Sequence, residues 1–149
     1  MKSDKKNNFS LKKFNKKFFH FFSFLWLNSC AGWICIRKRS GKKELLCIMK
    51  KNGQLALPKW RKEKWETLEW TALREFREET WLHNNRLGIK IGTIYDYKRR
   101  KKITLYWIEQ STGQHSIIRD EAIMWVELSQ SAEKMQHKSE RQFIKKYLL

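Results

Sequence analysis

Three glutamates in the middle of the chain have a spacing that suits metal chemistry. Glu75, Glu78 and Glu79 stand at positions i, i+3 and i+4, so a helix would place them on one face within a single turn. Like charges this close repel one another and destabilise the helix. A divalent cation that prefers oxygen ligands would convert the repulsion into binding. The spacing therefore indicates a metal-binding helix, with a solvated acidic face as the alternative.

The residues around these glutamates resemble the Nudix box, G-x5-E-x7-R-E-U-x-E-E-x-G-U, in which U is a bulky apolar residue. The charged positions of the box are all present and in register: Glu66, Arg74, Glu75, Glu78 and Glu79. Phe76 and Leu82 fill the two apolar positions, and Leu57-Pro58-Lys59 is similar to the family's LPK lead-in. The resemblance extends roughly from residue 31 to residue 128, which is most of the chain.

This resemblance implies both a fold and a reaction. The fold is an α/β/α sandwich with a mixed β-sheet, in which the catalytic helix follows the box loop. The reaction is hydrolysis of a nucleoside diphosphate linked to another group, with Mg²⁺ or Mn²⁺ as the cofactor. The LPK lead-in is most similar to members that act on dinucleoside polyphosphates. Nucleoside triphosphates, nucleotide sugars and RNA 5′ ends stay open, because specificity lies in loops outside the box.

The resemblance also assigns roles to the box residues. Glu78 and Glu79 match the metal-ligand pair, and Glu75 would bind a second metal or orient and deprotonate water. The main-chain carbonyl of Lys59, or that of residue 60, would be a further ligand.

Other charged residues receive supporting roles from the same resemblance. Arg74 and Glu66 are expected to form an ion pair that fixes the box loop against the helix. A further carboxylate from a later loop often joins the site in this family. Glu121 and Asp120 are the candidates here, and Glu109 is a weaker one.

Substrate contacts are expected from a basic hairpin. Residues 98–102, KRRKK, separate two β-like runs and predict a hairpin with a basic tip. Arg99 and Arg100 in this tip, together with Lys59, are expected to contact substrate phosphates, and a solvated turn is the alternative. Three tyrosines nearby would either stack on a base or pack as core aromatics: Tyr95, Tyr97 and Tyr106.

The remaining pattern predicts strands on both sides of the helix. Strands are expected over residues 31–38, 44–50, 87–97, 103–109 and 122–128, with a turn at Asn52-Gly53. Thr67 is expected to cap the acidic helix, and Ser129 and Ser139 to start two short helices. The run from Ser139 to Gln142 fits a capping box. No internal repeat or second domain is visible.

The composition of the chain indicates which kinds of partner it attracts. The chain has 149 residues and a net charge of +18, so it is attracted to polyanions such as nucleotides, RNA or an anionic membrane. A lysine-rich surface without a polyanionic partner is the alternative. Cys30, Cys35 and Cys47 have no metal-ligand spacing and are expected to be buried thiols in a reducing cytosol. The oligomeric state is not determined by the sequence.

The first 29 residues form a basic, phenylalanine-rich extension ahead of a domain spanning residues 30–149. Residues 18–27, FFHFFSFLWL, follow a lysine-rich start, which resembles a signal peptide, and Leu27-Asn28-Ser29-Cys30 resembles a lipoprotein cleavage site. The apolar run is too short to span a bilayer, which takes about 20 residues. We favour a cytoplasmic protein with a basic tail, with membrane tethering or export as the alternative.

The glycines of the box are replaced. Positions 60 and 81, and position 65 before the first glutamate, all hold tryptophan. One interpretation is a Nudix domain with altered turns that binds RNA or nucleotides and has impaired catalysis. The other, which we favour, is that UGA codons read as glycine in the source were translated as tryptophan. The chain has 8 Trp and only 6 Gly, while average usage predicts about 10 glycines.

We expect glycine at positions 60, 65 and 81 of the protein isolated from its source. Peptide mass spectrometry across residues 60–82 measures this directly. Tryptophan masses at the three positions would refute the codon interpretation and favour the impaired, binding form.

Overall fold

The computed structural model describes residues 27–80, 85–110 and 122–149, and these form two four-stranded sheets with three helices. The strands are β1 (Asn28–Ile34), β2 (Ile36–Arg39), β3 (Lys42–Met49), β4 (Leu55–Ala56), β5 (Lys59–Arg61), β6 (Asn85–Asp96), β7 (Lys101–Gln110) and β8 (Ala122–Glu127). The helices are α2 (Leu68–Thr80), α3 (Leu128–Lys134) and α4 (Lys138–Tyr147). None of the helices in these residues is long and apolar enough to cross a membrane.

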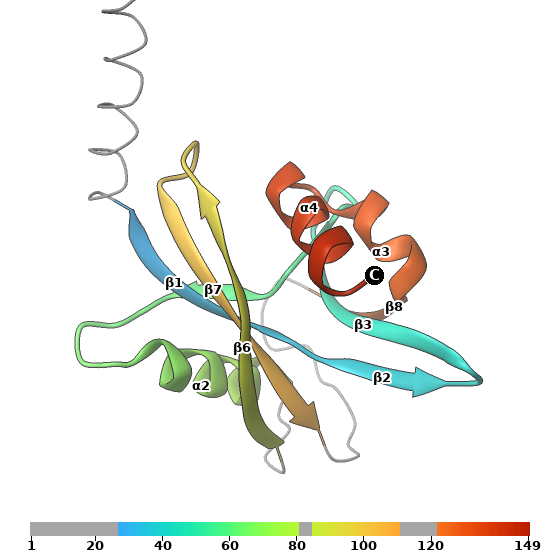
Figure 1. Cartoon of the computed structure of the whole chain (residues 1–149), viewed down its shortest axis with the longest axis horizontal. Coiled ribbons are helices and arrows are strands. Elements are labelled where there is room, and N and C mark those ends of the chain that lie inside the picture. Colours follow the sequence, from blue (N-terminus) through green and yellow to red (C-terminus); the bar gives the residue numbers. More distant parts are fainter. Residues whose placement is uncertain (1–26, 81–84, 111–121) are drawn as a thin grey trace, which may run out of the picture.

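The first sheet is mixed and carries α2. Its strand order is β5-β1-β7-β6, with β1 parallel to β7 and the other pairs antiparallel. In the second sheet, β3 pairs with β2, β4 and β8. Figure 1 shows α2 on one side of the first sheet, with α3 and α4 on the other. The predicted α/β/α sandwich with a mixed sheet is confirmed.

The side chains of β7 alternate between the two faces of the sheet, so this strand contributes to the core on the α2 side and on the α4 side. Ile103 and Leu105 belong to a buried cluster that includes Phe143 and Ile144 of α4. Tyr106, from the opposite face of the strand, packs with Ala72 of α2. Successive strand residues point to opposite faces, so β7 serves both layers.

Most of the predicted elements are present, with shifted ends. The strand predicted over 31–38 is divided at Cys35 into β1 and β2, which join different sheets. The Asn52-Gly53 turn is confirmed, and Gly53 has the positive φ of 78° that favours glycine. The basic hairpin is confirmed, with its turn between Asp96 and Lys101.

The predicted capping box at Ser139 is wrong. Helix α4 begins at Lys138, and His137 occupies the N-cap position without a side-chain capping bond. Ser139 Oγ instead lies 3.5 Å from Oδ2 of Asp96, the last residue of β6 before the hairpin turn. The helix α3 likewise begins one residue before Ser129.

All three cysteines are buried and unbridged, as expected. Burial raises the pKa of Cys35 and of Cys47 to about 12. These thiols therefore act as small apolar core residues.

Candidate active site

Helix α2 begins at the position that the sequence predicts. Thr67 Oγ1 accepts a hydrogen bond from the Trp70 N–H at 3.1 Å, which caps the helix. Phe76 and Ala72 are fully buried against the sheet. The register of this apolar side fixes the direction of the remaining side chains of α2, including its glutamates.

Arg74 lies at the centre of the acidic group. Its Nε is 2.5 Å from Glu66 Oε1 and its Nη2 is 3.2 Å from Glu66 Oε2. Its Nη1 lies 2.8 Å from Glu75 Oε1 and 3.0 Å from Glu78 Oε2. One guanidinium therefore orients three carboxylates, and the ion pair expected between Arg74 and Glu66 is present.

Glu66 has several hydrogen-bond partners. Besides Arg74, it accepts hydrogen bonds from Thr71 Oγ1 at 2.8 Å and from the Glu63 N–H at 3.1 Å. The hydrogen bonds from Arg74 lower the pKa of Glu66 to about 2. The same pairing raises the pKa of Arg74, which stays protonated. Glu66 thus anchors the loop before α2 to the helix as a charged carboxylate at neutral pH.

The three metal-ligand candidates lie on one turn of α2. Glu75 and Glu79 are almost completely buried, whereas Glu78 is exposed. Their carboxylate oxygens are the donors that Mg²⁺ and Mn²⁺ prefer, so the donor set fits the expected metal. Within the described ranges, no three acidic, histidine or cysteine side chains converge closely enough to hold an ion. Glu121 and Asp120, expected from a later loop, lie outside the described residues.

Lys59 faces away from this helix. The main chain of Lys59, in β5, pairs with Gly32 of β1. Helix α2 packs against β5. The ammonium group of Lys59 instead forms an ion pair with the buried Glu140 of α4 and donates a hydrogen bond to the Leu57 carbonyl at 3.0 Å. The segment 57–59 therefore lies between the acidic helix and α4.

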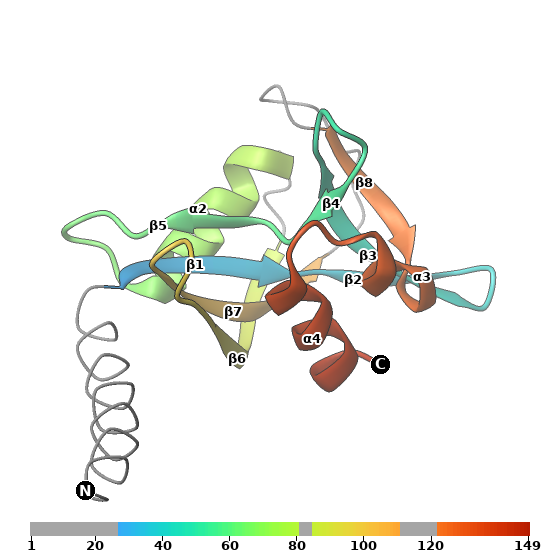
Figure 2. The same ribbon diagram turned by 90° about the horizontal axis from the view of Figure 1, so that it is seen from above.

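A basic hollow of about 780 Å³ opens between the β6–β7 turn and the start of α4. Its cationic lining consists of Lys98, Arg99, Lys138 and Arg141. Tyr95 and Tyr97 also line it, with ring centroids 6.4 Å apart and planes at 17°. Both rings are exposed, so for Tyr95 and Tyr97 the structure does not support the core-packing alternative and leaves the stacking alternative open. In Figure 2 the β6–β7 turn lies near the start of β1, where the Asn28 N–H donates a hydrogen bond to the Arg100 carbonyl oxygen at 2.8 Å.

The other residues that the sequence singles out for contact with the substrate or the metal have different surroundings. Arg99 pairs with Asp96 at 2.5 Å while lining the hollow. Arg100 takes a positive φ of 53° in the turn and is not among the hollow's lining residues. Tyr106 is a core residue, since it is buried and its hydroxyl donates to Glu69 at 2.8 Å. Glu109 forms a surface ion pair with Arg86 at 2.7 Å.

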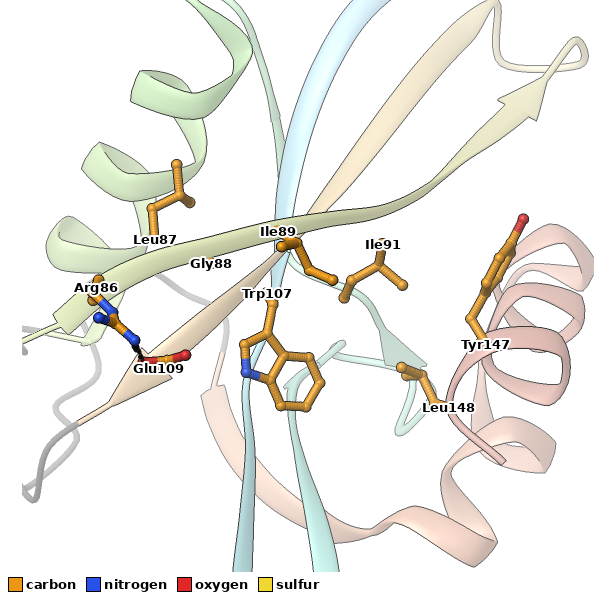
Figure 3. Close-up of a pocket in the computed structure, with 9 residues that line it drawn as sticks. All are labelled: Arg86, Leu87, Gly88, Ile89, Ile91, Trp107, Glu109, Tyr147 and Leu148. Carbon is orange, nitrogen blue, oxygen red and sulfur yellow. Dashed lines mark hydrogen bonds and ion pairs between the residues drawn. The ribbon is translucent and has the colours of Figure 1, made fainter.

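A second hollow, of about 790 Å³, lies on the α4 side of the sheet (Figure 3). Trp107, Ile91 and Ile89 line it from the sheet, and Tyr147 and Leu148 from the end of α4. This lining is mostly apolar and includes none of the box carboxylates. We therefore place the chemistry at α2.

Tryptophan fits the backbone at two of the glycine positions of the box. The non-glycine residues with positive φ among those described are Ser40 and Arg100, so Trp60 and Trp65 adopt ordinary conformations. Trp60 stacks on the buried Trp33 with centroids 6.4 Å apart, and Trp65 is 82% exposed. Position 81 lies outside the described residues. The backbone at 60 and 65 therefore does not require glycine.

Sequence reasoning missed two polar residues of this region. Thr71 is buried and bonded to Glu66, and Glu140 holds Lys59. A signal for Glu140 existed, because it stands three and four residues before Phe143 and Ile144. That spacing places a carboxylate on the apolar face of α4. An acid on an apolar face indicates a buried partner.

We expect Glu66→Gln to lower the unfolding temperature at neutral pH and to have no effect near pH 2. The folded pKa of about 2 lies below the ordinary 4.5. The stabilisation is therefore complete above pH 4.5 and is lost as the pH falls towards 2. Thermal unfolding over a pH series measures this, with the exposed Glu63→Gln as control. A difference that does not shrink on acidification would contradict the ion-pair account.

Comparison with known proteins agrees with this geometry. The NUDIX domain family model matches residues 29–147. A search of curated proteins finds no significant match. Among solved structures, the chain is similar to a C. elegans Ap4A hydrolase in a binary complex, with 18% identity and a TM-score of 0.66, over 80% of this chain and 94% of that one. The NUDIX domain of Shewanella oneidensis NrtR complexed with ADP ribose has 17% identity and a TM-score of 0.62, over 80% and 84%.

A Nudix hydrolase from M. smegmatis, RenU, gives 16% identity and a TM-score of 0.61, over 80% and 83% of the two chains. At these identities the structures show a shared fold. The family model covers most of the chain, and the box residues stand together on α2 and its preceding loop. The chain therefore belongs to the Nudix family of hydrolases, which act on phosphoric anhydride bonds.

Proposed function

We propose that this protein is a metal-dependent pyrophosphohydrolase of nucleoside diphosphate-linked compounds, with dinucleoside polyphosphates and nucleoside triphosphates as its candidate substrates. The observation that carries the proposal is the Arg74 guanidinium at the middle of α2, which is bound to Glu66, Glu75 and Glu78. An isolated acidic helix face would not need so many fixed contacts. Residues held in one geometry are what a site for charge stabilisation requires.

The residues of α2 would hold Mg²⁺ or Mn²⁺ through Glu75, Glu78 and Glu79, with the Lys59 main-chain carbonyl as a further ligand. When bound, the metal would lower the pKa of the attacking water and neutralise charge on the pyrophosphate oxygens. Arg74 keeps Glu75 and Glu78 in place, and Glu66 keeps Arg74 in place. Glu75 is the candidate for orienting the water and accepting its proton.

The basic hollow supports a nucleotide as the substrate. Four cationic side chains around it would attract a polyphosphate. Tyr95 and Tyr97 offer exposed ring faces on which a base can stack. The Lys59 segment connects the hollow to α2, since Lys59 and Arg99 both approach Glu140. The names of two similar structures, an Ap4A hydrolase and a NUDIX domain complexed with ADP ribose, are in keeping with this class.

We expect Glu78→Gln to reduce Mg²⁺-dependent turnover of diadenosine tetraphosphate or a nucleoside triphosphate by about a hundredfold or more. Glu78 is exposed, so its replacement should leave the fold intact. The matched control is Glu63→Gln, which changes an exposed glutamate in the preceding loop and should retain full turnover. Equal turnover by the two variants would remove Glu78 from the site.

The alternative is a Nudix-fold module with impaired catalysis that binds RNA or nucleotides through its basic surface. The net charge of +18 favours it. Such a module would show no metal-dependent turnover, and its RNA affinity would fall steeply with salt concentration. Filter binding at several salt concentrations, beside the turnover assay, separates the two functions.

A further inference from the structure

We propose that Glu140 is a positioning residue for the metal site: its buried carboxylate fixes the main chain of residues 57–59, whose Lys59 carbonyl is the expected metal ligand. This inference rests on the proposed function, which it deepens. Glu140 belongs to α4, far along the chain from the box. The sequence pattern of the family motif does not include it.

The carboxylate of Glu140 contacts the segment at two points. Oε2 accepts a hydrogen bond from the Leu57 N–H at 3.2 Å, and Oε1 pairs with the Lys59 ammonium. The same ammonium donates to the Leu57 carbonyl at 3.0 Å. Both main-chain polar groups of Leu57 are therefore held, one by Glu140 directly and one through Lys59.

The next peptide group has little freedom either. The Trp33 N–H donates to the Pro58 carbonyl oxygen at 3.4 Å. A Cβ on Gly32 would lie 2.3 Å from that oxygen, so only glycine permits this approach. Lys59 itself pairs with Gly32 across the β1–β5 ladder. The segment is thus fixed from β1 on one side and from α4 on the other.

Glu140 is buried and belongs to a balanced set of charges, so it has no role at the surface. Glu140 is 0% exposed, and the Lys59 side chain is 10% exposed. Arg99 Nη2 is 3.7 Å from Glu140 Oε1 and is itself paired with Asp96. Two acids and two bases balance, as buried charges must. Burial lowers the pKa of Lys59, against the pull of Glu140 in the other direction.

The arrangement also excludes a direct role for Glu140 in the chemistry. Its two oxygens are directed at Leu57 and Lys59, and it lies on α4, on the opposite side of the sheet from α2 (Figure 1). Glu140 therefore acts through the segment that it holds. Replacing it should affect the metal site through the position of that segment, with the box carboxylates unchanged.

The test compares Glu140→Gln with wild type in full-length protein. Glutamine keeps the shape, but its neutral amide oxygen accepts the Leu57 N–H more weakly than a carboxylate does, and it removes the charge that balances Lys59. The matched control is Glu133→Gln. Glu133 lies on the neighbouring helix α3, where it forms a surface ion pair with Lys145 of α4. Mn²⁺ affinity is measured by electron paramagnetic resonance of the free ion, and exchange of the Leu57 amide hydrogen by NMR.

We expect Glu140→Gln to weaken Mn²⁺ binding about tenfold or more, the size typical of groups that orient ligands. The Leu57 amide should exchange faster, and Glu133→Gln should match wild type in both readouts. Wild-type Mn²⁺ affinity in Glu140→Gln, despite faster exchange at Leu57, would overturn the positioning role. So would an equal loss in the Glu133→Gln control.

If Glu140→Gln alone does not fold, the double variant Lys59→Met with Glu140→Gln removes the unpaired buried ammonium. Its Mn²⁺ affinity should stay reduced, and a wild-type value would overturn the proposal. These readouts need no substrate. A wild-type protein that binds Mn²⁺ but hydrolyses nothing would refute the proposed function and leave the role of Glu140 standing.

Discussion

The structure depends on one guanidinium group surrounded by carboxylates. Without Arg74, the negative charges of Glu66, Glu75 and Glu78 would repel one another along α2 and the loop that precedes it. With it, the loop before the helix, the helix and the candidate metal ligands form a single connected unit. A guanidinium suits this task, because its planar array of donors can reach several carboxylates at fixed angles.

A second charged cluster lies on the other side of the sheet. Lys59, Glu140, Arg99 and Asp96 connect the segment before the box, the last helix and the hairpin tip. Segment 57–59 lies between the two clusters, so its main chain is held close to α2 while its lysine is held by α4. The fold thus joins three parts of the chain that are distant in sequence. Buried ion pairs of this kind add little net stability, because desolvation offsets most of their attraction.

The sequence predicted the acidic helix well, because Glu66, Arg74 and the three glutamates lie within one local stretch whose period fixes their common face. The hairpin and most strands were also predictable from alternation and turn residues. The break at Cys35 was not, since it arises where one strand passes from the first sheet to the second. The spacing of Glu140 before Phe143 and Ile144 marks an acid on an apolar face, but its partners Leu57 and Lys59 were not predictable, because they are more than 80 residues away. The capping-box prediction failed because its serine contacts Asp96 of the hairpin instead.

The most direct test of the account is hydrolysis of diadenosine tetraphosphate in ¹⁸O-labelled water, with the products weighed by mass spectrometry. The account predicts that wild-type protein with Mg²⁺ places one labelled oxygen on one phosphate product, and that chelation of the metal abolishes the reaction. Binding of the nucleotide without cleavage, or cleavage that persists without metal, would contradict a pyrophosphohydrolase built on the carboxylates of α2.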